Sequence, residues 1–109
     1  MSGERWNYKR FRQWRDEMEK VGIRSRDKHI TPTYDIEAIA RDLCVTERHV
    51  RTYCSGLRNG EPVTVPAYIV RLCECLLARK RVGYALADAR QKHPHLAEII
   101  DPIIRMVTP

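Results

Sequence analysis

The sequence predicts an all-α protein, a compact bundle of about five to six helices that contains a helix-turn-helix. Apolar residues recur every three or four positions in successive segments, which is the period of an amphipathic helix. No segment shows the strict alternation of apolar and polar residues that is typical of a half-buried strand. A chain of 109 residues suffices for one hydrophobic core and is too short for a multidomain enzyme.

The first expected helix covers residues 7–21. Its apolar residues form one stripe, because they follow one another at spacings of three, four and three: Phe11, Trp14, Met18 and Val21. Gly22 can end this helix. The polar stretch 24–33 is expected to be a loop. One interpretation of its basic residues Arg24, Arg26 and Lys28 is an arm that binds along the backbone or in the minor groove of a nucleic acid.

Two short helices are expected next, each preceded by a capping residue. Asp35 can cap a helix whose inward face contains Ile36, Ile39, Ala40 and Leu43. Thr46 can cap a third helix that contains Val50 and Tyr53 and ends at Gly56. Because only Cys44 and Val45 separate the two helices, we expect them to meet at a steep angle.

The second half of the chain predicts three more helical segments. Pro66 suits the first position of a fourth helix, whose apolar residues extend to Leu77 and lie on more than one face. A fifth helix is expected over about residues 83–92 and a last one over 94–107. Pro102 lies inside the last pattern, so a kink or two short helices are expected there.

Residues 36–56 resemble the helix-turn-helix of the phage-repressor family, the lambda-repressor-like and Cro-like DNA-binding domains. Ala40 matches the small residue between the two helices, Val45 the apolar residue of the turn and Thr46 the cap. The resemblance covers about residues 34–78. It implies a basic N-terminal helix and loop (1–33), a DNA-binding core (34–78) and C-terminal helices (79–109). Cys44 occupies the turn position where the family favours Gly, which adopts a left-handed backbone without strain.

The resemblance makes the third helix the recognition helix. If Val50 and Tyr53 point inward, the opposite face can enter the major groove and contact bases. That face carries Glu47, Arg48, Arg51, Thr52 and Ser55. Arginine can bind guanine with two hydrogen bonds, glutamate can accept from cytosine, and threonine can pack on a thymine methyl. The alternative is an ordinary solvated helix face.

Phosphate contacts are expected around the recognition helix. The chain has a net charge of +6, which favours a polyanionic partner. Its basic residues are concentrated in the two flanks, whereas residues 31–77 are nearly neutral. The candidate phosphate-contacting residues are Thr46, Arg58, Asn59, Arg79, Lys80, Arg81, Lys9 and Arg12. For the first-helix bases, a soluble helix face is an equally good explanation.

The C-terminal segment carries more apolar surface than a terminal helix normally exposes. The candidate dimerisation residues are Leu96, Ile99, Ile100, Ile103 and Ile104. They can cover the fourth helix as part of the core or pair with a second copy, and the sequence does not decide between the two.

Cysteine usage and composition argue against other classes. Cys44, Cys54, Cys73 and Cys75 lie in apolar-periodic segments and are expected to be buried free thiols rather than disulfides or metal ligands. We expect no metal, no cofactor and no enzymatic activity, because no paired-carboxylate, triad or phosphate-loop constellation is present. Without a signal peptide or a membrane-spanning run, a cytoplasmic protein that does not bind membranes is expected.

The function expected from these observations is sequence-specific binding of double-stranded DNA. The best match is a phage or prophage-type transcriptional repressor that acts as a homodimer on a palindromic operator. Repressor and activator are not distinguished, and contacts to RNA polymerase or a protein antagonist stay open. The alternatives are a phage DNA-packaging or assembly component of higher oligomeric state, and a helix-turn-helix adaptor that binds a protein.

Overall fold

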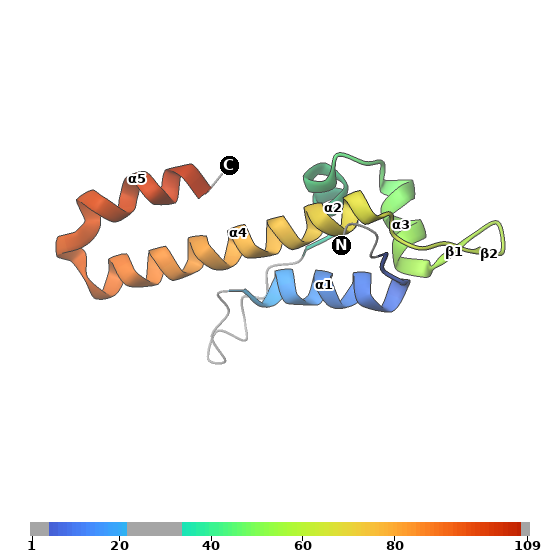
Figure 1. The fold of residues 1–109 in the computed structure, drawn as a ribbon, viewed down its shortest axis with the longest axis horizontal. Helices are drawn as coiled ribbons and strands as arrows, with labels where there is room; N and C mark the ends of the chain where they lie inside the picture. Colours follow the sequence, from blue (N-terminus) through green and yellow to red (C-terminus); the bar gives the residue numbers. More distant parts are fainter. Residues whose placement is uncertain (1–4, 22–33, 108–109) are drawn as a thin grey trace.

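The computed structural model describes residues 5–21 and 34–107, and confirms the all-α prediction apart from one very short hairpin. Within these ranges no helix is both long enough and apolar enough to span a bilayer. Figure 1 shows the arrangement of the elements. They are α1 (Tyr8–Lys20), α2 (Ile36–Leu43), α3 (Glu47–Ser55), β1 (Leu57–Arg58), β2 (Glu61–Pro62), α4 (Ala67–Lys92), the 3-10 helix η1 (Pro94–Leu96) and α5 (Ala97–Val107).

Helix α1 begins and packs as its sequence predicts. The side chain of Asn7 caps it by accepting a hydrogen bond from the backbone N–H of Arg10 at 2.9 Å. Phe11, Trp14 and Met18 are buried, so the predicted stripe is the inward face. The helix ends at Lys20, just before Gly22, and the possible arm at 24–33 lies outside the described residues.

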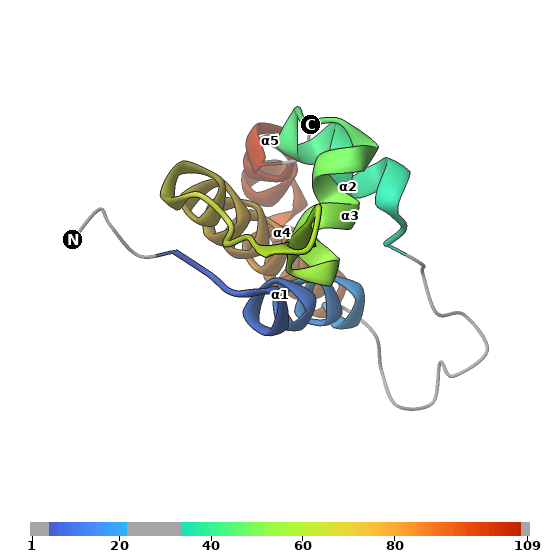
Figure 2. The ribbon, with the colours of Figure 1, turned by 90° about the vertical axis from the view of Figure 1, so that its right-hand side faces the viewer.

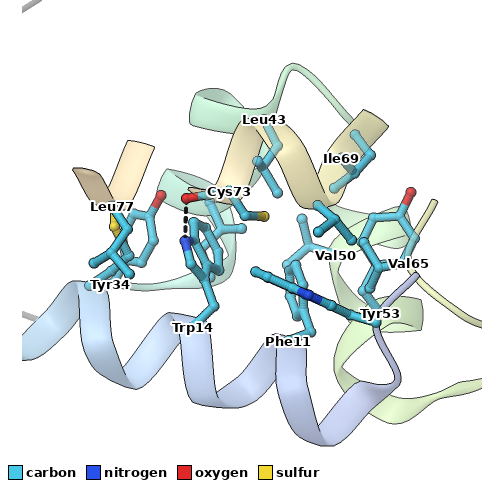
Figure 3. Packing of buried hydrophobic residues seen from close by; sticks show 14 of the residues in the cluster. Phe11, Trp14, Tyr34, Leu43, Val50, Tyr53, Val65, Ile69, Cys73 and Leu77 are labelled. Carbon is cyan, nitrogen blue, oxygen red and sulfur yellow. Dashed lines mark hydrogen bonds between the residues drawn. The ribbon is translucent and has the colours of Figure 1, made fainter. Parts of the chain in front are cut away.

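The core lies where α1, α2, α3 and the first half of α4 meet (Figure 3). Trp14 is central to it, because its indole Nε1 donates a hydrogen bond to the carbonyl oxygen of Cys73 at 2.7 Å. The ring of Phe11 lies 5.4 Å from that of Trp14 and 5.5 Å from that of Tyr53, centroid to centroid. Burying aromatic rings of this size is a major source of stability in a small domain. Helix α1 and the helix-turn-helix therefore share one core and are not separate domains.

Helix α4 is one continuous helix of 26 residues, so the prediction of a break between a fourth and a fifth helix is wrong. The segment 78–82 contains alanine, lysine and arginine, which favour helix and carry it through Gly83. Gly83 itself lies against α5, where an added Cβ would be 3.9 Å from the side chain of Val107. The expected boundary at residue 78 therefore falls inside a helix.

Helix α5 folds back along the second half of α4 (Figure 1). The last segment begins at Pro94, as expected, and consists of η1 followed by α5. At Pro102 the helix continues, contrary to the two short helices expected there.

The four cysteines are free thiols, as predicted, but only Cys73 is fully buried. Cys54 is half-buried. Cys44 and Cys75 are exposed, so the expectation that they are buried is wrong. Cys44 is exposed because it lies in the turn after α2, and Cys75 because it lies at a solvent-facing position of α4.

Candidate nucleic-acid interface

The turn between α2 and α3 has the geometry that the helix-turn-helix resemblance implies. Cys44 adopts the left-handed conformation, with φ 56° and ψ 40°, at the position where glycine was expected. The next backbone N–H, that of Val45, donates to the carbonyl oxygen of Ala40 at 3.0 Å and closes the end of α2. Thr46 then caps α3, since its hydroxyl oxygen accepts from the N–H of His49 at 3.2 Å.

The inward faces of the two helices are those predicted. Ile39, Ala40 and Leu43 of α2 are buried, as are Val50 and Tyr53 of α3. Burial raises the pKa of the Tyr53 phenol, so this side chain stays neutral in the physiological range. The outward side of α3 is thus free to contact a ligand.

The elements after α3 form a β-hairpin that the sequence analysis treated as a loop. Leu57 pairs with Pro62 and Arg58 with Glu61. Asn59 and Gly60 have φ values of 52° and 80°, which is the two-residue turn that matches the twist of antiparallel strands. Arg58 and Asn59, both predicted to contact phosphate, are therefore exposed at the tip of a short projecting hairpin (Figure 1).

A hollow of about 790 Å³ lies between α3, the preceding turn, the hairpin and the start of α4. We call it the basic groove, because its lining contains three arginines and one histidine and, within the described ranges, no carboxylate. The elements that line it, α3, the hairpin and the start of α4, lie at the end of the molecule that faces the viewer in Figure 2. Its polar lining residues are Arg5, Thr46, Arg48, His49, Thr52, Arg58, Thr64 and Tyr68.

Only some of the predicted base-contacting residues line this groove. Arg48 and Thr52 line it. Glu47 and Arg51 do not, and they form an exposed ion pair with 3.7 Å between Oε1 and Nη2. The hydroxyl of Ser55 is used at the end of α3, where it donates to the carbonyl oxygens of Thr52 and Leu57 at 3.2 and 3.1 Å.

The predicted phosphate-contacting residues are also divided. Thr46 and Arg58 line the groove, Asn59 is next to Arg58, and Lys9 is exposed on α1. Arg12 instead donates from Nε to the carbonyl oxygen of Cys54 at 2.7 Å.

The basic run in α4 lies away from the groove. Arg79 is 13 residues after Pro66, which is roughly 20 Å along a helix. Its Nε donates to the carbonyl oxygen of Val107, Lys80 Nζ donates to that of Met18, and Arg81 pairs with Glu17 at 3.5 Å. Burial lowers the pKa of Lys80. These three side chains thus connect α4 to its neighbours.

Besides Thr64, three polar residues of the groove were missed by the sequence analysis. Arg5 reaches it because Trp6 pairs with Val65, and Arg5 Nε donates to the hydroxyl of Thr64 at 2.9 Å. No local periodicity signals this long-range pairing. Tyr68 is 70% exposed in the first turn of α4, and an aromatic residue outside the apolar stripe was a usable signal. His49, the third, follows the cap by three residues.

The predicted dimerisation residues do not share one face. Ile100 is only 6% exposed, and Leu96 and Ile104 are half-buried. By contrast, Ile99 and Ile103 are 64% and 40% exposed. The inner side of α5 therefore packs against α4, as one of the two alternatives expects, and its outer side is exposed.

Comparison with known proteins gives no relative. No family model, no curated protein and no solved structure matches the chain. The basic groove is therefore the feature of the molecule from which a function can be inferred.

Proposed function

We propose that this protein binds double-stranded DNA in a sequence-specific manner and acts as a transcriptional regulator, a repressor of the phage type that works as a homodimer. The observation that carries the proposal is the basic groove beside α3. Arg5, Arg48 and Arg58 contribute positive charge to it, and the described part of its lining has no carboxylate to cancel that charge. Clefts lined by one sign of charge concentrate oppositely charged ligands.

The side chains of the groove suit two kinds of DNA contact. Arg48 and Thr52 project from the recognition helix, where a guanidinium can bind guanine O6 and N7 and a threonine methyl can pack on thymine. These two residues are flanked by Arg58 of the hairpin and by Arg5, which is hydrogen-bonded to Thr64. Both arginines can donate hydrogen bonds to phosphate oxygens. In this arrangement α3 supplies base readout, and the hairpin and the N-terminal segment fix its register.

The ion pair between Glu47 and Arg51 favours Arg48 as the principal base contact. A guanidinium that already faces a carboxylate must give up that partner before it binds a base, although exposed pairs of this kind are weak. Among the described residues that line the groove beside Arg48, none is a carboxylate.

The test is selection of preferred duplexes from a random-sequence pool, followed by affinity measurements on the selected site and on random DNA. For Arg48→Ala we expect about a 10- to 100-fold loss on the selected site and a smaller loss on random DNA. Arg51→Ala is the matched control on the same helix and should lose less. Failure to enrich any sequence would refute specific DNA binding and favour an adaptor that binds protein. A ring of many copies in solution would favour a packaging component.

A further inference from the structure

The second half of α4 and α5 extend beyond the shared core as a two-helix arm, which we define as residues 78–107. The molecule is elongated for this reason, with extents of 56 × 35 × 22 Å. Within the arm, which lies wholly in the described part of the chain, Ile100 is the one buried hydrophobic residue. Two helices by themselves bury little apolar surface, and helices in proteins owe most of their stability to packing. The arm therefore lacks a core of its own.

Both helices of the arm carry an apolar stripe that the other does not cover. On α5 the stripe is Ile99, Ile103 and Met106, which are 64%, 40% and 79% exposed. On α4 it is Ala78, Val82, Ala85 and Ala89, of which Val82 is 47% exposed and Ala78 and Ala85 are also exposed. The spacings of three and four residues place each stripe on one face of its helix.

The two stripes face the same side of the arm. The α4–α5 contact runs through Arg79, Gly83 and Arg90, which meet Val107 and Asp101. Relative to this contact line, each stripe is rotated by about 100° around its helix, and because the helices are antiparallel the two rotations converge on one side. In Figure 2 helix α1 lies below α4, and α2 and α3 lie to its right. We call the seven residues of the two stripes the arm face.

We propose that the arm face binds the arm face of a second copy of the chain, so that the two arms form a four-helix bundle. This inference rests on the proposed function, because it names the surface of the homodimer. All seven residues of the face are uncharged. Two further helices are what a two-helix arm needs in order to enclose a core.

The sizes of the side chains on the arm face fit a second copy. The large residues are on α5 and the small ones are mostly on α4. Two contacts fix the height of α5 along α4: Val107 lies beside Gly83, and Asp101 binds Arg90. Ile103 is therefore level with the α4 residues between Gly83 and Arg90. A two-fold axis parallel to the helices then sets Ile103 against Ala85 and Ala89 of the partner, as a large side chain in a gap between small ones.

The exposed area is adequate for such an interface. Covering Ile99, Ile103, Met106 and Val82 removes roughly 300 Å² of apolar surface per copy from water. Specific interfaces bury about 800 Å² per partner, a little more than half of it apolar, and the polar borders of the two helices supply the remainder. Ala85 is 17 residues from Tyr68, or about 26 Å along α4, so the dimer leaves the basic groove open.

The test compares two alanines of α4 that lie on opposite sides of the helix. Ala85 is on the arm face, whereas Ala87 is exposed off it. Sedimentation of the full-length wild type over about a hundredfold concentration range should show a monomer–dimer equilibrium. Ala85→Arg should shift the midpoint to at least about tenfold higher concentration, and Ala87→Arg should leave it unchanged. Ile103→Glu and Arg105→Glu form the same comparison on α5.

Circular dichroism of each variant checks that the helical content is kept. A wild type that stays monomeric throughout, or a dimer that resists both Ala85→Arg and Ile103→Glu, overturns the inference. Binding of a random-sequence duplex by the Ala85→Arg monomer is measured in parallel. If the monomer binds DNA, the proposed function stands whatever the outcome for the arm face. If the dimer forms but neither it nor the monomer binds any duplex, the proposed function fails and the interface remains.

Discussion

The guanidinium Nε of Arg12 donates a hydrogen bond to the carbonyl oxygen of Cys54 at 2.7 Å. Cys54 is in the last turn of α3, where backbone carbonyls have no partner within the helix. Arg12 thus supplies a cation and a donor at the C-terminus of α3, and both stabilise that end. Arg12, for which a phosphate contact is predicted, thus holds α3 against α1.

Replacing Arg12 should therefore lower stability. For Arg12→Met we expect a loss of about 1 kcal/mol in the free energy of unfolding, the usual contribution of one hydrogen bond. Lys9→Met, on an exposed position of the same helix, should change it by less than about 0.5 kcal/mol. Urea unfolding measures both. Equal effects of the two changes would mean that the hydrogen bond of Arg12 contributes nothing specific.

Two glycines with left-handed backbones provide a second comparison. Gly56 has φ +77°, and an added Cβ would lie 2.6 Å from Cδ1 of Tyr8. Gly60 has φ +80°, but no described atom lies within 4 Å of such a Cβ. Gly60→Ala should cost only the backbone strain, about 1 kcal/mol. Gly56→Ala should cost at least about 1 kcal/mol more, because Tyr8 must also move. Thermal unfolding of both variants measures the difference.

The buried thiol of Cys73 makes stability sensitive to alkaline pH. Burial, with a smaller contribution from the charge of Glu74, raises its pKa from 9.0 to about 12. Below pH 9 the thiol is neutral in both states and the folded state has its full stability. Between pH 9 and 12 only the unfolded state ionises, so stability falls as the pH rises.

Between pH 8 and pH 10 this one group should lower the free energy of unfolding by about 1.4 kcal/mol. Urea unfolding at the two pH values measures this difference in the free energy of unfolding. Cys73→Ala should reduce the difference by about 1.4 kcal/mol, and it should lower stability at both pH values. Cys75→Ala, at an exposed position, is the control and should leave the difference unchanged. A wild-type difference that survives in Cys73→Ala would assign the effect to other groups.

Salt dependence of DNA binding separates the basic groove from the basic run of α4. Replacing Arg5 and Arg58 with Gln should reduce the slope of log affinity against log salt concentration by about two. Each lost arginine accounts for about one unit, because one DNA phosphate contact is lost with it. Neutralising Arg79 and Arg81 to Gln should leave the slope unchanged and lower stability, because these side chains bind Val107 and Glu17. The reverse pattern would place DNA along α4.

Much of the fold follows from local sequence signals. Asp35 and Thr46 cap the helices expected of them, and Phe11, Trp14 and Met18 form the predicted inward stripe. The left-handed conformation of Cys44 was anticipated from its place in the motif. These features depend on hydrogen bonds and periodicities within a few residues, which a single sequence displays directly.

The features that were missed depend on contacts between distant segments. The hairpin is an exception, because Asn59-Gly60 is a strong turn signal that was available in the sequence. The continuity of α4 through Gly83 is a further exception, because the helix-forming residues of segment 78–82 were a local signal for it. Arg5 joins the groove only through the pairing of Trp6 with Val65. Some basic side chains, such as those of Arg12 and Arg79, form hydrogen bonds within the protein. Which of them do so likewise depends on their tertiary neighbours.

The unbroken course of α4 has a consequence for operator spacing. In a dimer built through the arm face, the residue count between Tyr68 and Ala85 fixes the direction in which each basic groove faces relative to the two-fold axis. One inserted residue would turn one end against the other by about 100° and lengthen the helix by roughly 1.5 Å. Seven would restore the direction to within about 20° and add roughly 10 Å. Because the proposed two-fold axis runs parallel to the helices, added length moves both grooves together along that axis. The rotation of each groove about α4 is therefore what would set the spacing of the half-sites.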